Sequence, residues 1–406
     1  MIQFCIRWLI SKTYRHAVEM RRTVIKITRA QTDLLKPEAI EALYNECDGL
    51  KAVIDETCDR EKLTNGMKAL EKVATKHLQP YPNAVMRENI EVVLVAVAVA
   101  MGIRTFFLQP FKIPTGSMQP TLYGITSQDL RGTDVKFPSM FTPTGFIDNW
   151  FRGYSYKEVK AKVSGEITRW DSEPVKVILP FITKQRFWIG NEPHTVWFPP
   201  DKLFSGHYPD GRGRSGLHRG QHFEKGQEVI KLKVISGDHL FVDRLTYNFR
   251  TPTRGEIVVF ATKGVNGLPQ NQFYIKRLIA TGDEQVRILD DRHVVIDDER
   301  LDASTPRFEH LYGFQFDPLV PPVGSTWSGH ANGKYTFHAR YFPSSNVVHT
   351  VRSNHFLVMG DNTMNSSDSR TWGDFSRTNV IGKSAFVYWP IFRQEERNGR
   401  FGWCHR

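Results

Sequence analysis

The chain is poor in cysteine and lacks several familiar catalytic motifs. Its four cysteines, Cys5, Cys47, Cys58 and Cys404, include no Cys-x-x-Cys pair, which argues against a disulfide framework or a zinc ribbon. Neither a Gly-x-Ser-x-Gly nucleophile elbow nor a His-Glu-x-x-His metal motif occurs. The composition also excludes wholesale disorder and collagen-like or coiled-coil architectures, because 40% of the residues are hydrophobic and 12% are aromatic.

What the chain has in excess is positive charge. Its 54 Lys and Arg against 43 Asp and Glu give a net charge of +11 over 406 residues. A basic balance suits nucleic acid or an anionic membrane surface, but net charge alone does not select a partner. The length is compatible with two or three domains.

One long apolar run extends from Val92 to Leu108, and Arg104 is its only charged residue. At 1.5 Å per residue it is about 25 Å long, enough to cross a hydrocarbon core if Arg104 extends toward the interface. The alternative is a buried core helix, but such helices usually carry a polar stripe. We therefore predict a transmembrane helix over 90–108.

Residues 1–89 are expected to be helical, with breaks near Pro37, Gly49 and Gly66. Their first part forms either a basic amphipathic segment at a membrane surface or a solvated helix face. The residues concerned are Phe4, Arg7, Trp8, Leu9, Lys12, Arg15, Arg21 and Arg22. Lys72, Lys76 and Arg87 precede the apolar run and only Lys112 closely follows it, which favours a cytoplasmic amino terminus.

Beyond the apolar run, residues 109–406 contain short β-branched and aromatic runs bounded by Gly, Pro and Asn, such as GEIVVFAT and NHFLVMGD. This texture predicts a mainly β, antiparallel domain. Residues 125–235 and 300–350 are harder to place and are interpreted as insertions on that scaffold.

Three tempting motifs fail in their sequence context. The glycine pattern of Gly211–Gly216 follows no apolar strand, and the segment ending Gly382-Lys383-Ser384 has Arg377 where a phosphate-binding loop needs glycine. His207, His218 and His222 lie close together, but no carboxylate completes a zinc site and no metal is predicted.

One serine stands in an unusual setting just past the apolar run, in QPFKIPTGSMQPTL, Gln109 to Leu122. Its prolines fix an extended, turn-broken backbone, and Gly116 permits close approach of another group. Ser117 is therefore a candidate nucleophile. At no more than about 3.5 Å per residue, it lies within roughly 30 Å of Leu108.

A serine nucleophile needs a base, and Lys276 suits that role. Strand alternation in FYIKRLIA places Tyr274, Lys276 and Leu278 on one face. Apolar neighbours would lower the pKa of the lysine toward the working pH. Taken alone, the residue is better interpreted as a strand lysine that extends to solvent, and only the wider pattern favours the base.

Four segments together resemble bacterial type I signal peptidase, a membrane-bound leader peptidase with a Ser-Lys dyad. They are IRTFFLQPFKIPTGSMQPTL, GDHLFVDR, the pair RGEIVVF and YIKRLIATGD, and MGDNTMNSSDSRTWGDF. They occur in the family's order and cover about a fifth of the chain. The resemblance implies an antiparallel-sheet catalytic domain of signal-peptidase type.

The resemblance also implies roles for individual residues. Ser117 would be the nucleophile, Lys276 the general base, and the Ser117 N–H with the Thr115 hydroxyl the oxyanion hole. Ser366 would orient the lysine amine, supported by an Asp368–Arg370 ion pair, although an ordinary polar turn is the alternative for these three. The implied substrate pocket comprises Phe111, Ile113, Pro114, Met118, Leu122, Tyr274 and Ile275.

The chain departs from the family's pattern in four places. Thr363 and Met364 stand where the family often has Arg and Asp, and the turn Ala280–Asp283 is one residue shorter than usual. About 110 residues separate Leu122 from Gly237, segments that normally follow each other closely. The helical region of about 89 residues is also additional.

The expected function is therefore removal of signal peptides from exported preproteins after an Ala-x-Ala site, without a cofactor. The expected location is the bacterial cytoplasmic membrane, with the catalytic domain on the periplasmic side. Preproteins and membrane lipid are the expected partners, and the secretion translocon is a further candidate. The alternative is a catalytically silent, membrane-anchored binding protein; a nucleic-acid binder lacks any recognised module.

Overall fold

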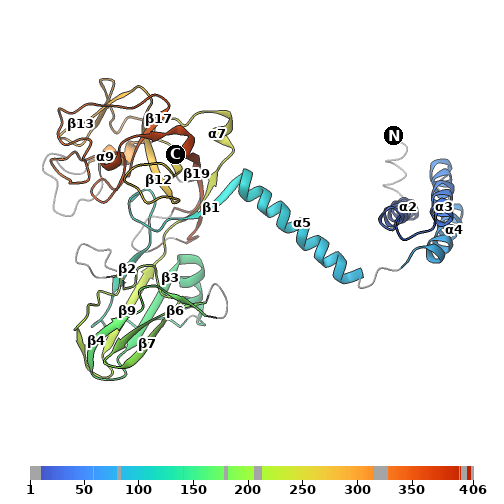
Figure 1. Ribbon diagram of the computed structural model, residues 1–406, viewed down its shortest axis with the longest axis horizontal. Coiled ribbons are helices and arrows are strands. Elements are labelled where there is room, and N and C mark those ends of the chain that lie inside the picture. Colours follow the sequence, from blue (N-terminus) through green and yellow to red (C-terminus); the bar gives the residue numbers. More distant parts are fainter. Residues whose placement is uncertain are drawn as a thin grey trace. The chain divides into compact units, whose positions relative to one another are not determined.

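The structure is a computed structural model that describes residues 11–57, 59–79, 84–139, 141–177, 182–204, 213–314, 328–392, 394 and 400–403. The chain divides into two compact units, Met1–Ala98 and Val99–Arg406 (Figure 1). An amino-terminal helical region and one apolar helix precede a mainly antiparallel β region, as the sequence predicts. The breaks expected near Gly49 and Gly66 are wrong, because these glycines lie inside the helices Pro37–Glu56 and Arg60–His77, where packing of the apolar faces outweighs the low helix propensity of glycine.

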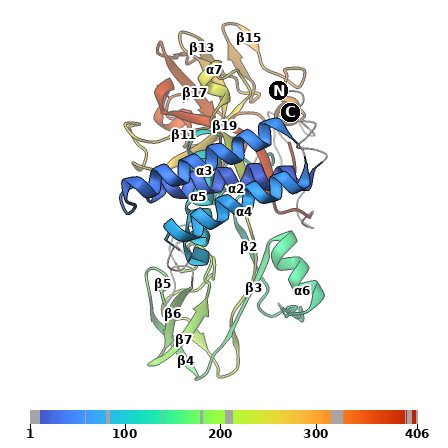
Figure 2. The same cartoon turned by 90° about the vertical axis from the view of Figure 1, so that its right-hand side faces the viewer.

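Three helices form the first part of the chain (Figure 2): α2 (Lys12–Ala30), α3 (Pro37–Glu56) and α4 (Arg60–His77). Their starts follow local chemistry, because Ser11 and Asp59 accept capping hydrogen bonds and Pro37 occupies the first turn of α3. One shared apolar cluster, which includes Leu43 and Leu63, holds the three helices together.

Helix α5 (Ala84–Phe106) carries the apolar run. Within it, Met86–Phe106 is long and apolar enough to cross a membrane, and none of that segment is buried in the protein. Its large side chains are exposed, for example Leu94 at 62% and Val95 at 63%. A helix that is apolar on every side and exposed is a candidate membrane span.

The main sheet has seven antiparallel strands in the order β1-β10-β19-β11-β12-β17-β18. Their bounds are β1 (Leu108–Lys112), β10 (His239–Asp243), β19 (Val380–Trp389), β11 (Ile257–Ala261), β12 (Phe273–Thr281), β17 (His355–Met359) and β18 (Phe375–Ser376). Two apolar clusters, one around Val259 and the other around Phe260, fit the alternation of side chains along β11.

A smaller sheet extends this region in the order β15-β14-β13-β16. It comprises β13 (Gln285–Ile288), β14 (Val294–Ile296), β15 (Glu299–Arg300) and β16 (His349–Thr350). Short helices accompany the two sheets: α7 (Thr246–Phe249), α8 (Glu309–Tyr312), α9 (Ser369–Trp372) and η2 (Arg377–Asn379). Buried residues of this sheet pack with Leu357 and Met359 of β17, so the two sheets share a core.

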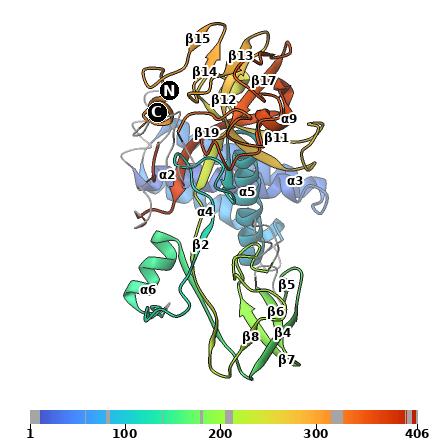
Figure 3. The same cartoon turned by 90° about the vertical axis from the view of Figure 1, so that its left-hand side faces the viewer.

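The long stretch after the serine segment is an inserted β region with its own core (Figure 3). It begins with a sheet ordered β2-β9-β3, comprising β2 (Thr126–Asp129), β9 (Glu228–Ile235) and β3 (Tyr154–Lys160). Further strands are β4 (Gly165–Trp170), β5 (Val175–Lys176), β6 (Thr183–Ile189), β7 (Glu192–Trp197) and β8 (His222–Phe223). Helix α6 (Pro143–Ile147) and the π-helix η1 (Asp148–Arg152) lie between β2 and β3 in the chain.

Several residues discussed from the sequence lie outside the described part of the chain. They are Phe4, Cys5, Arg7, Trp8, Leu9, Cys58, His207, Gly211 and Cys404. The described cysteine Cys47 is a free thiol buried among α2, α3 and α4.

Candidate active site

The serine lies in a turn-rich segment that follows β1 and is fastened at both ends by Asp238. Ile113 N donates to the Asp238 carbonyl over 2.9 Å, and Asp238 N donates to the Tyr123 carbonyl over 2.8 Å. The Asp238 carboxylate also accepts from Tyr123 N at 2.7 Å. These bonds fix the ends of the segment that carries Ser117, which is itself only 7% exposed.

Lys276 lies on β12, one strand from the centre of the main sheet, and reaches the serine. Its Nζ is 2.7 Å from Ser117 Oγ and 3.1 Å from the Ile275 carbonyl. The side chain is only 4% exposed. The Tyr274 ring lies on the same strand face, with its centroid 5.5 Å from Nζ.

Burial lowers the pKa of Lys276 from 10.5 to about 8. The negative charges of Asp368 and Asp361 oppose this shift, and the positive charge of Arg370 adds to it. Desolvation prevails because a buried ammonium loses its hydration while these carboxylates are already paired with arginines. At pH 7 about a tenth of the lysine is therefore an unprotonated amine, the form that could accept a proton from the serine.

A buried ion pair lies behind the dyad in the segment that follows β17. Asp368 and Arg370 are both fully buried, with 2.8 Å between Arg370 Nη2 and Asp368 Oδ2. Burial would raise the pKa of Asp368, but the Arg370 charge and hydrogen bonds hold it below its usual value. Arg370 also donates to the hydroxyl and the carbonyl of Thr363. Thr363, where the resembled family often has arginine, therefore has hydrogen-bond partners within the same segment.

Ser366 is fully buried in the same segment. Within the described residues its Oγ has no partner at ordinary hydrogen-bonding geometry, although it lies near enough to the Asp368 carboxyl to help lower its pKa. A Cβ added to Gly360 would lie 2.2 Å from Ser366 Oγ and 2.5 Å from the Ser117 carbonyl. Gly360 therefore separates Ser366 from the backbone of the serine segment.

Asn362 holds the serine segment from the other side. Its backbone N–H donates to the Ser117 carbonyl and its side-chain amide to the Gly116 carbonyl, both over 3.0 Å. Sequence reasoning assigned no role to Asn362 or Gly360. The only available signal was their place in MGDN, beside a strand that ends in the closing segment.

A second buried ion pair, between Arg277 and Asp361, helps to join the serine segment, the lysine strand and the closing segment. This pair was not predicted from the sequence. Arg277 Nη2 lies 2.6 Å from Asp361 Oδ2, and Arg277 Nε donates to Oδ1 over 2.8 Å. The Thr121 hydroxyl donates to the same carboxylate. Consequently the serine segment, the lysine strand and the closing segment are linked by charge-assisted hydrogen bonds.

The residues implied for substrate binding do not all share one cluster. Ile113, Met118 and Leu122 are buried together, and Phe111 and Ile275 pack against them. Tyr274 packs against the other cluster of the main sheet, with Phe260 and Leu278. Pro114 and Thr115 are exposed beside Ser117.

The end of the chain also reaches this region. Arg400 makes two hydrogen bonds to the Asp238 carboxylate, Nε at 2.8 Å and Nη2 at 2.7 Å. Its guanidinium carbon lies 4.4 Å from the centroid of the Tyr123 ring. An isolated arginine this close to the chain end gave no sequence signal.

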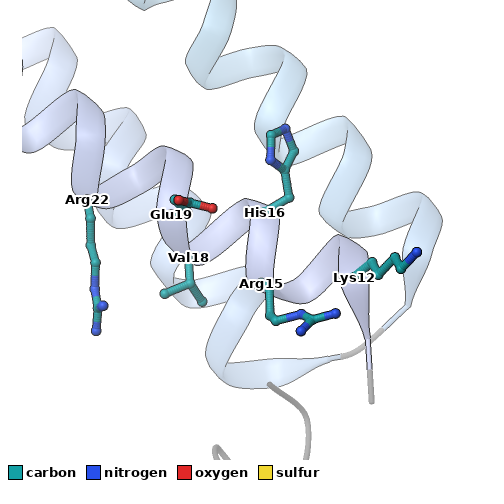
Figure 4. Close-up of a pocket in the computed structure, with 6 residues that line it drawn as sticks. All are labelled: Lys12, Arg15, His16, Val18, Glu19 and Arg22. Atoms are coloured by element: carbon teal, nitrogen blue, oxygen red, sulfur yellow. The ribbon is translucent and has the colours of Figure 1, made fainter. Parts of the chain in front are cut away.

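A separate hollow is lined by residues of α2 (Figure 4). None of the site residues described so far belongs to this helix. Figure 4 shows Lys12, Arg15 and Arg22 along it, with Val18 between them. These basic residues belong to the segment for which membrane binding and a solvated face were the alternatives.

Replacing Gly360 by alanine is expected to lower catalytic efficiency about a hundredfold, because the new methyl group would displace Ser117 or Ser366. The measurement is kcat/KM for the reaction proposed below, together with a melting curve. Gly49→Ala is the matched control, since a Cβ there meets nothing within 4 Å. Equal activity of both variants would contradict the close approach.

A serine hydroxyl beside a buried lysine of lowered pKa is the arrangement found in hydrolases that use lysine as general base. The family model "Signal peptidase, peptidase S26" matches residues 86–127 and 228–389. That match covers half of the chain, and the chain therefore belongs to this family.

Curated relatives agree with the family. The chain is 30% identical to signal peptidase I of Leptolyngbya laminosa over 163 residues, covering 39% of this chain and 64% of the relative. Identity to signal peptidase I of Mycobacterium tuberculosis is 25%, covering 39% and 59%. For the chloroplast thylakoidal processing peptidase 1 of Arabidopsis thaliana it is 25%, covering 38% and 37%. The chain thus spans less than two thirds of these relatives.

A crystal structure of a signal peptidase I from Enterococcus faecalis covers 33% of this chain and 97% of its own, at 22% identity. Its TM-score of 0.22 is too low to compare folds. The family match omits residues 128–227, which contain most of the inserted β region.

Proposed function

We propose that the protein is a membrane-bound serine endopeptidase that removes amino-terminal signal peptides from exported preproteins after an Ala-x-Ala site. The observation that carries this proposal is the 2.7 Å separation of Lys276 Nζ from Ser117 Oγ. Burial and a pKa of about 8 make the amine available as a base near neutral pH.

In the proposed mechanism, the neutral amine of Lys276 accepts the Ser117 hydroxyl proton while Oγ attacks the scissile carbonyl. The Ser117 N–H and the Thr115 hydroxyl stabilise the oxyanion of the tetrahedral intermediate. The lysine ammonium then protonates the leaving amine, and the new amino terminus departs. In the second half, Lys276 accepts a proton from water, which hydrolyses the acyl-enzyme.

The remaining site residues hold the dyad in position. Asn362 fixes the backbone of the serine segment through two carbonyls. Ser366 orients the lysine amine, and the Asp368–Arg370 pair fixes the segment that carries Ser366. The Asp368 carboxylate and the Arg370 guanidinium are hydrogen-bonded to each other and to Gly360 and Thr363. Buried polar groups that are paired in this way keep a segment in one conformation.

The proposed pocket favours small side chains. Phe111 and Ile275 border the buried cluster that contains Ile113, Met118 and Leu122. Pro114 and Tyr274 complete the proposed rim. A packed apolar floor of this kind would accept alanine, because a larger side chain would require the floor to open.

The proposed topology has α5 crossing the membrane with the amino terminus in the cytoplasm. Lys72 and Lys76 precede the candidate span and Arg87 lies in its first turn, and positive charge is retained on the cytoplasmic side. The catalytic region then lies at the outer face of the bacterial cytoplasmic membrane. Only Phe107 separates α5 from β1, which keeps the dyad near the site where a signal peptide leaves the bilayer. The secretion translocon is a further proposed partner.

The test of the proposed function is cleavage of a preprotein with an Ala-x-Ala site by the full-length protein in detergent. Amino-terminal sequencing of the product should show a single cut after the second alanine. A preprotein with bulky residues in both alanine positions is the matched substrate control and should stay intact. If several well-folded preparations leave the preprotein uncut but bind it, the protein is instead a membrane-anchored binding protein on the same fold.

Activity is expected to rise with pH through about 8, because the base is the neutral form of Lys276. At pH 7 about a tenth of the lysine is neutral, so kcat/KM should gain close to tenfold between pH 7 and pH 9. The measurement is the pH profile of kcat/KM, which reports the free enzyme. A profile that is flat across this range would contradict the assignment of Lys276 as base.

A nucleic-acid binder remains a weaker alternative that rests only on the net charge of +11. The described residues form no recognised nucleic-acid module, and the proposed topology divides the charge between two sides of a membrane. Binding to DNA that survives physiological salt in a mobility-shift assay would be needed to favour it.

A further inference from the structure

The inserted β region presents a cationic and aromatic face that the proposed reaction does not use. In β6, Gln185, Phe187 and Ile189 are buried in the core of the inserted region. Strand alternation therefore turns Lys184, Arg186 and Trp188 to the opposite side.

Neighbouring strands extend the same face. The register pairs Arg169 of β4 with Trp188 and Trp197 of β7 with Lys184. Val175 of β5 also pairs with Lys184 and is 44% exposed. We call this surface the β6 face; it consists of Arg169, Val175, Lys184, Arg186, Trp188 and Trp197.

Cations and indole rings are interleaved on the β6 face. The guanidinium carbons of Arg169 and Arg186 lie 4.3 Å and 5.2 Å from the Trp188 ring centroid. Lys184 Nζ lies 5.8 Å from the ring of Trp197, which is 50% exposed. Stacking on indole holds a guanidinium in place while its N–H edges stay available to an anionic group.

The charge on this face is mostly uncompensated. The Asp171 carboxylate contacts one cation of this face, Arg186, with 3.1 Å between Oδ2 and Nε. Arg169 and Lys184 have no ion pair among the described residues, and Arg169 is exposed. A sheet face with surplus cations and tryptophan fits an anionic surface with an apolar layer beneath it.

We propose that the β6 face docks on the anionic headgroups of the bilayer that α5 crosses. The proposal rests on α5 being membrane-spanning, which is part of the proposed function. Strands β3 and β9 have seven and eight residues, so at about 3.3 Å per residue each is roughly 25 Å long, and they lead from the main-sheet region into the strands that carry the face. A domain held beside a bilayer meets its headgroups at high effective concentration, so a few weak contacts suffice.

The residue composition of the β6 face matches that of protein surfaces at membrane interfaces. Tryptophan prefers the headgroup level, and arginine binds phosphate in a bidentate manner. Each cation close to an anionic surface strengthens binding about fivefold. Arg169 and Lys184, whose charges are not offset by Asp171, would therefore act together against an anionic bilayer and very little against a neutral one.

The test uses full-length protein in nanodiscs of neutral phosphatidylcholine, with or without about 30% phosphatidylglycerol. Amide hydrogen exchange in peptides from β6 and β7 should slow at least about threefold in the anionic discs, and about 0.5 M salt should remove the effect. Equal exchange in the two lipid compositions would overturn the proposal.

Two double variants with the same change in net charge separate this face from general attraction. Arg169→Glu with Lys184→Glu should abolish the protection, whereas Lys136→Glu with Lys225→Glu, at exposed positions elsewhere in the inserted region, should retain it. Equal loss in both would overturn the assignment to this face. Unchanged melting temperatures confirm that each variant is folded.

A third arm distinguishes a protein partner from lipid. Poly-glutamate is added to the full-length protein in neutral detergent, and the same peptides are followed. Protection by poly-glutamate without protection by anionic lipid would overturn the lipid assignment in favour of an acidic polypeptide. Loss of preprotein cleavage with normal lipid protection would instead contradict only the proposed function.

Discussion

Replacing Ser117 by alanine is expected to lower kcat/KM for cleavage after an Ala-x-Ala site by at least about a thousandfold. Ser117 Oγ lies 2.7 Å from Lys276 Nζ, and alanine leaves no nucleophile at that position. Lys276→Met should cause a loss of similar size. It retains most of the buried side-chain volume but removes the base, so its effect reports chemistry and not a cavity.

The double variant should be no slower than the slower single variant, because the two residues act as one unit. Binding of an uncleaved preprotein should persist in all three variants. Lys263→Met, at an exposed lysine on the same unit, is the control and should keep full activity. A Ser117→Ala protein that still cleaved within tenfold of wild type would show that another residue is the nucleophile.

Replacing Asp368 by alanine is expected to destabilise the catalytic region by about 3–5 kcal/mol. The change leaves the Arg370 guanidinium charged and without its carboxylate in a site where both side chains are fully buried. It also removes the acceptor of the Gly360 N–H, at 2.9 Å. The measurement is thermal melting of the full-length protein in detergent, where a fall of about 5–8 °C is expected.

Asp171→Ala is the control for this experiment, because it removes a carboxylate from the partly exposed pair with Arg186. Such a pair contributes less than about 1 kcal/mol, so melting should hardly change. Adding Arg370→Met to Asp368→Ala should recover part of the lost stability, since no unpaired charge remains. Melting of Asp368→Ala within 2 °C of wild type would contradict the importance of the buried pair.

The order of structural classes along the chain could be predicted from local patterns. The uninterrupted apolar run predicted α5, and short β-branched runs predicted the antiparallel sheet; both predictions are confirmed. Hydrophobic periodicity and turn residues act over a few positions, and local sequence carries that information well. The internal order of the inserted region was not predicted, because its strand pairing depends on contacts far apart in sequence.

The pairing of serine and lysine across 159 residues came from the family resemblance and not from local pattern. Alternation placed Lys276 beside Tyr274 but could not say what faced the amine. The roles of Asn362 and Gly360 were not predicted, for a related reason. Asn362 matters because it donates to a backbone carbonyl beside Ser117, and Gly360 because no Cβ fits there. Neither property can be predicted from the residue type alone.

The ionic partners of Arg277 and Arg400 were equally inaccessible to sequence reasoning. Each arginine had many carboxylates available, and only the folded chain selects Asp361 and Asp238. The roles proposed for Thr115, Ser366 and the pocket residues stay predictions, and the kinetic experiments above bear on them directly.

The place where the inserted region joins the rest of the chain has an evolutionary consequence. Asp129 of β2 and Leu232 of β9 are paired neighbours on antiparallel strands, and Leu130 N donates to the Lys231 carbonyl over 2.8 Å. Everything between them is therefore the connection of a single hairpin, which a two-residue turn would close. Lengthening such a connection adds little closure entropy, so an ancestral chain could gain or exchange a module of this size at a small entropic cost, with adjustment only where the module meets Trp389 at the end of β19.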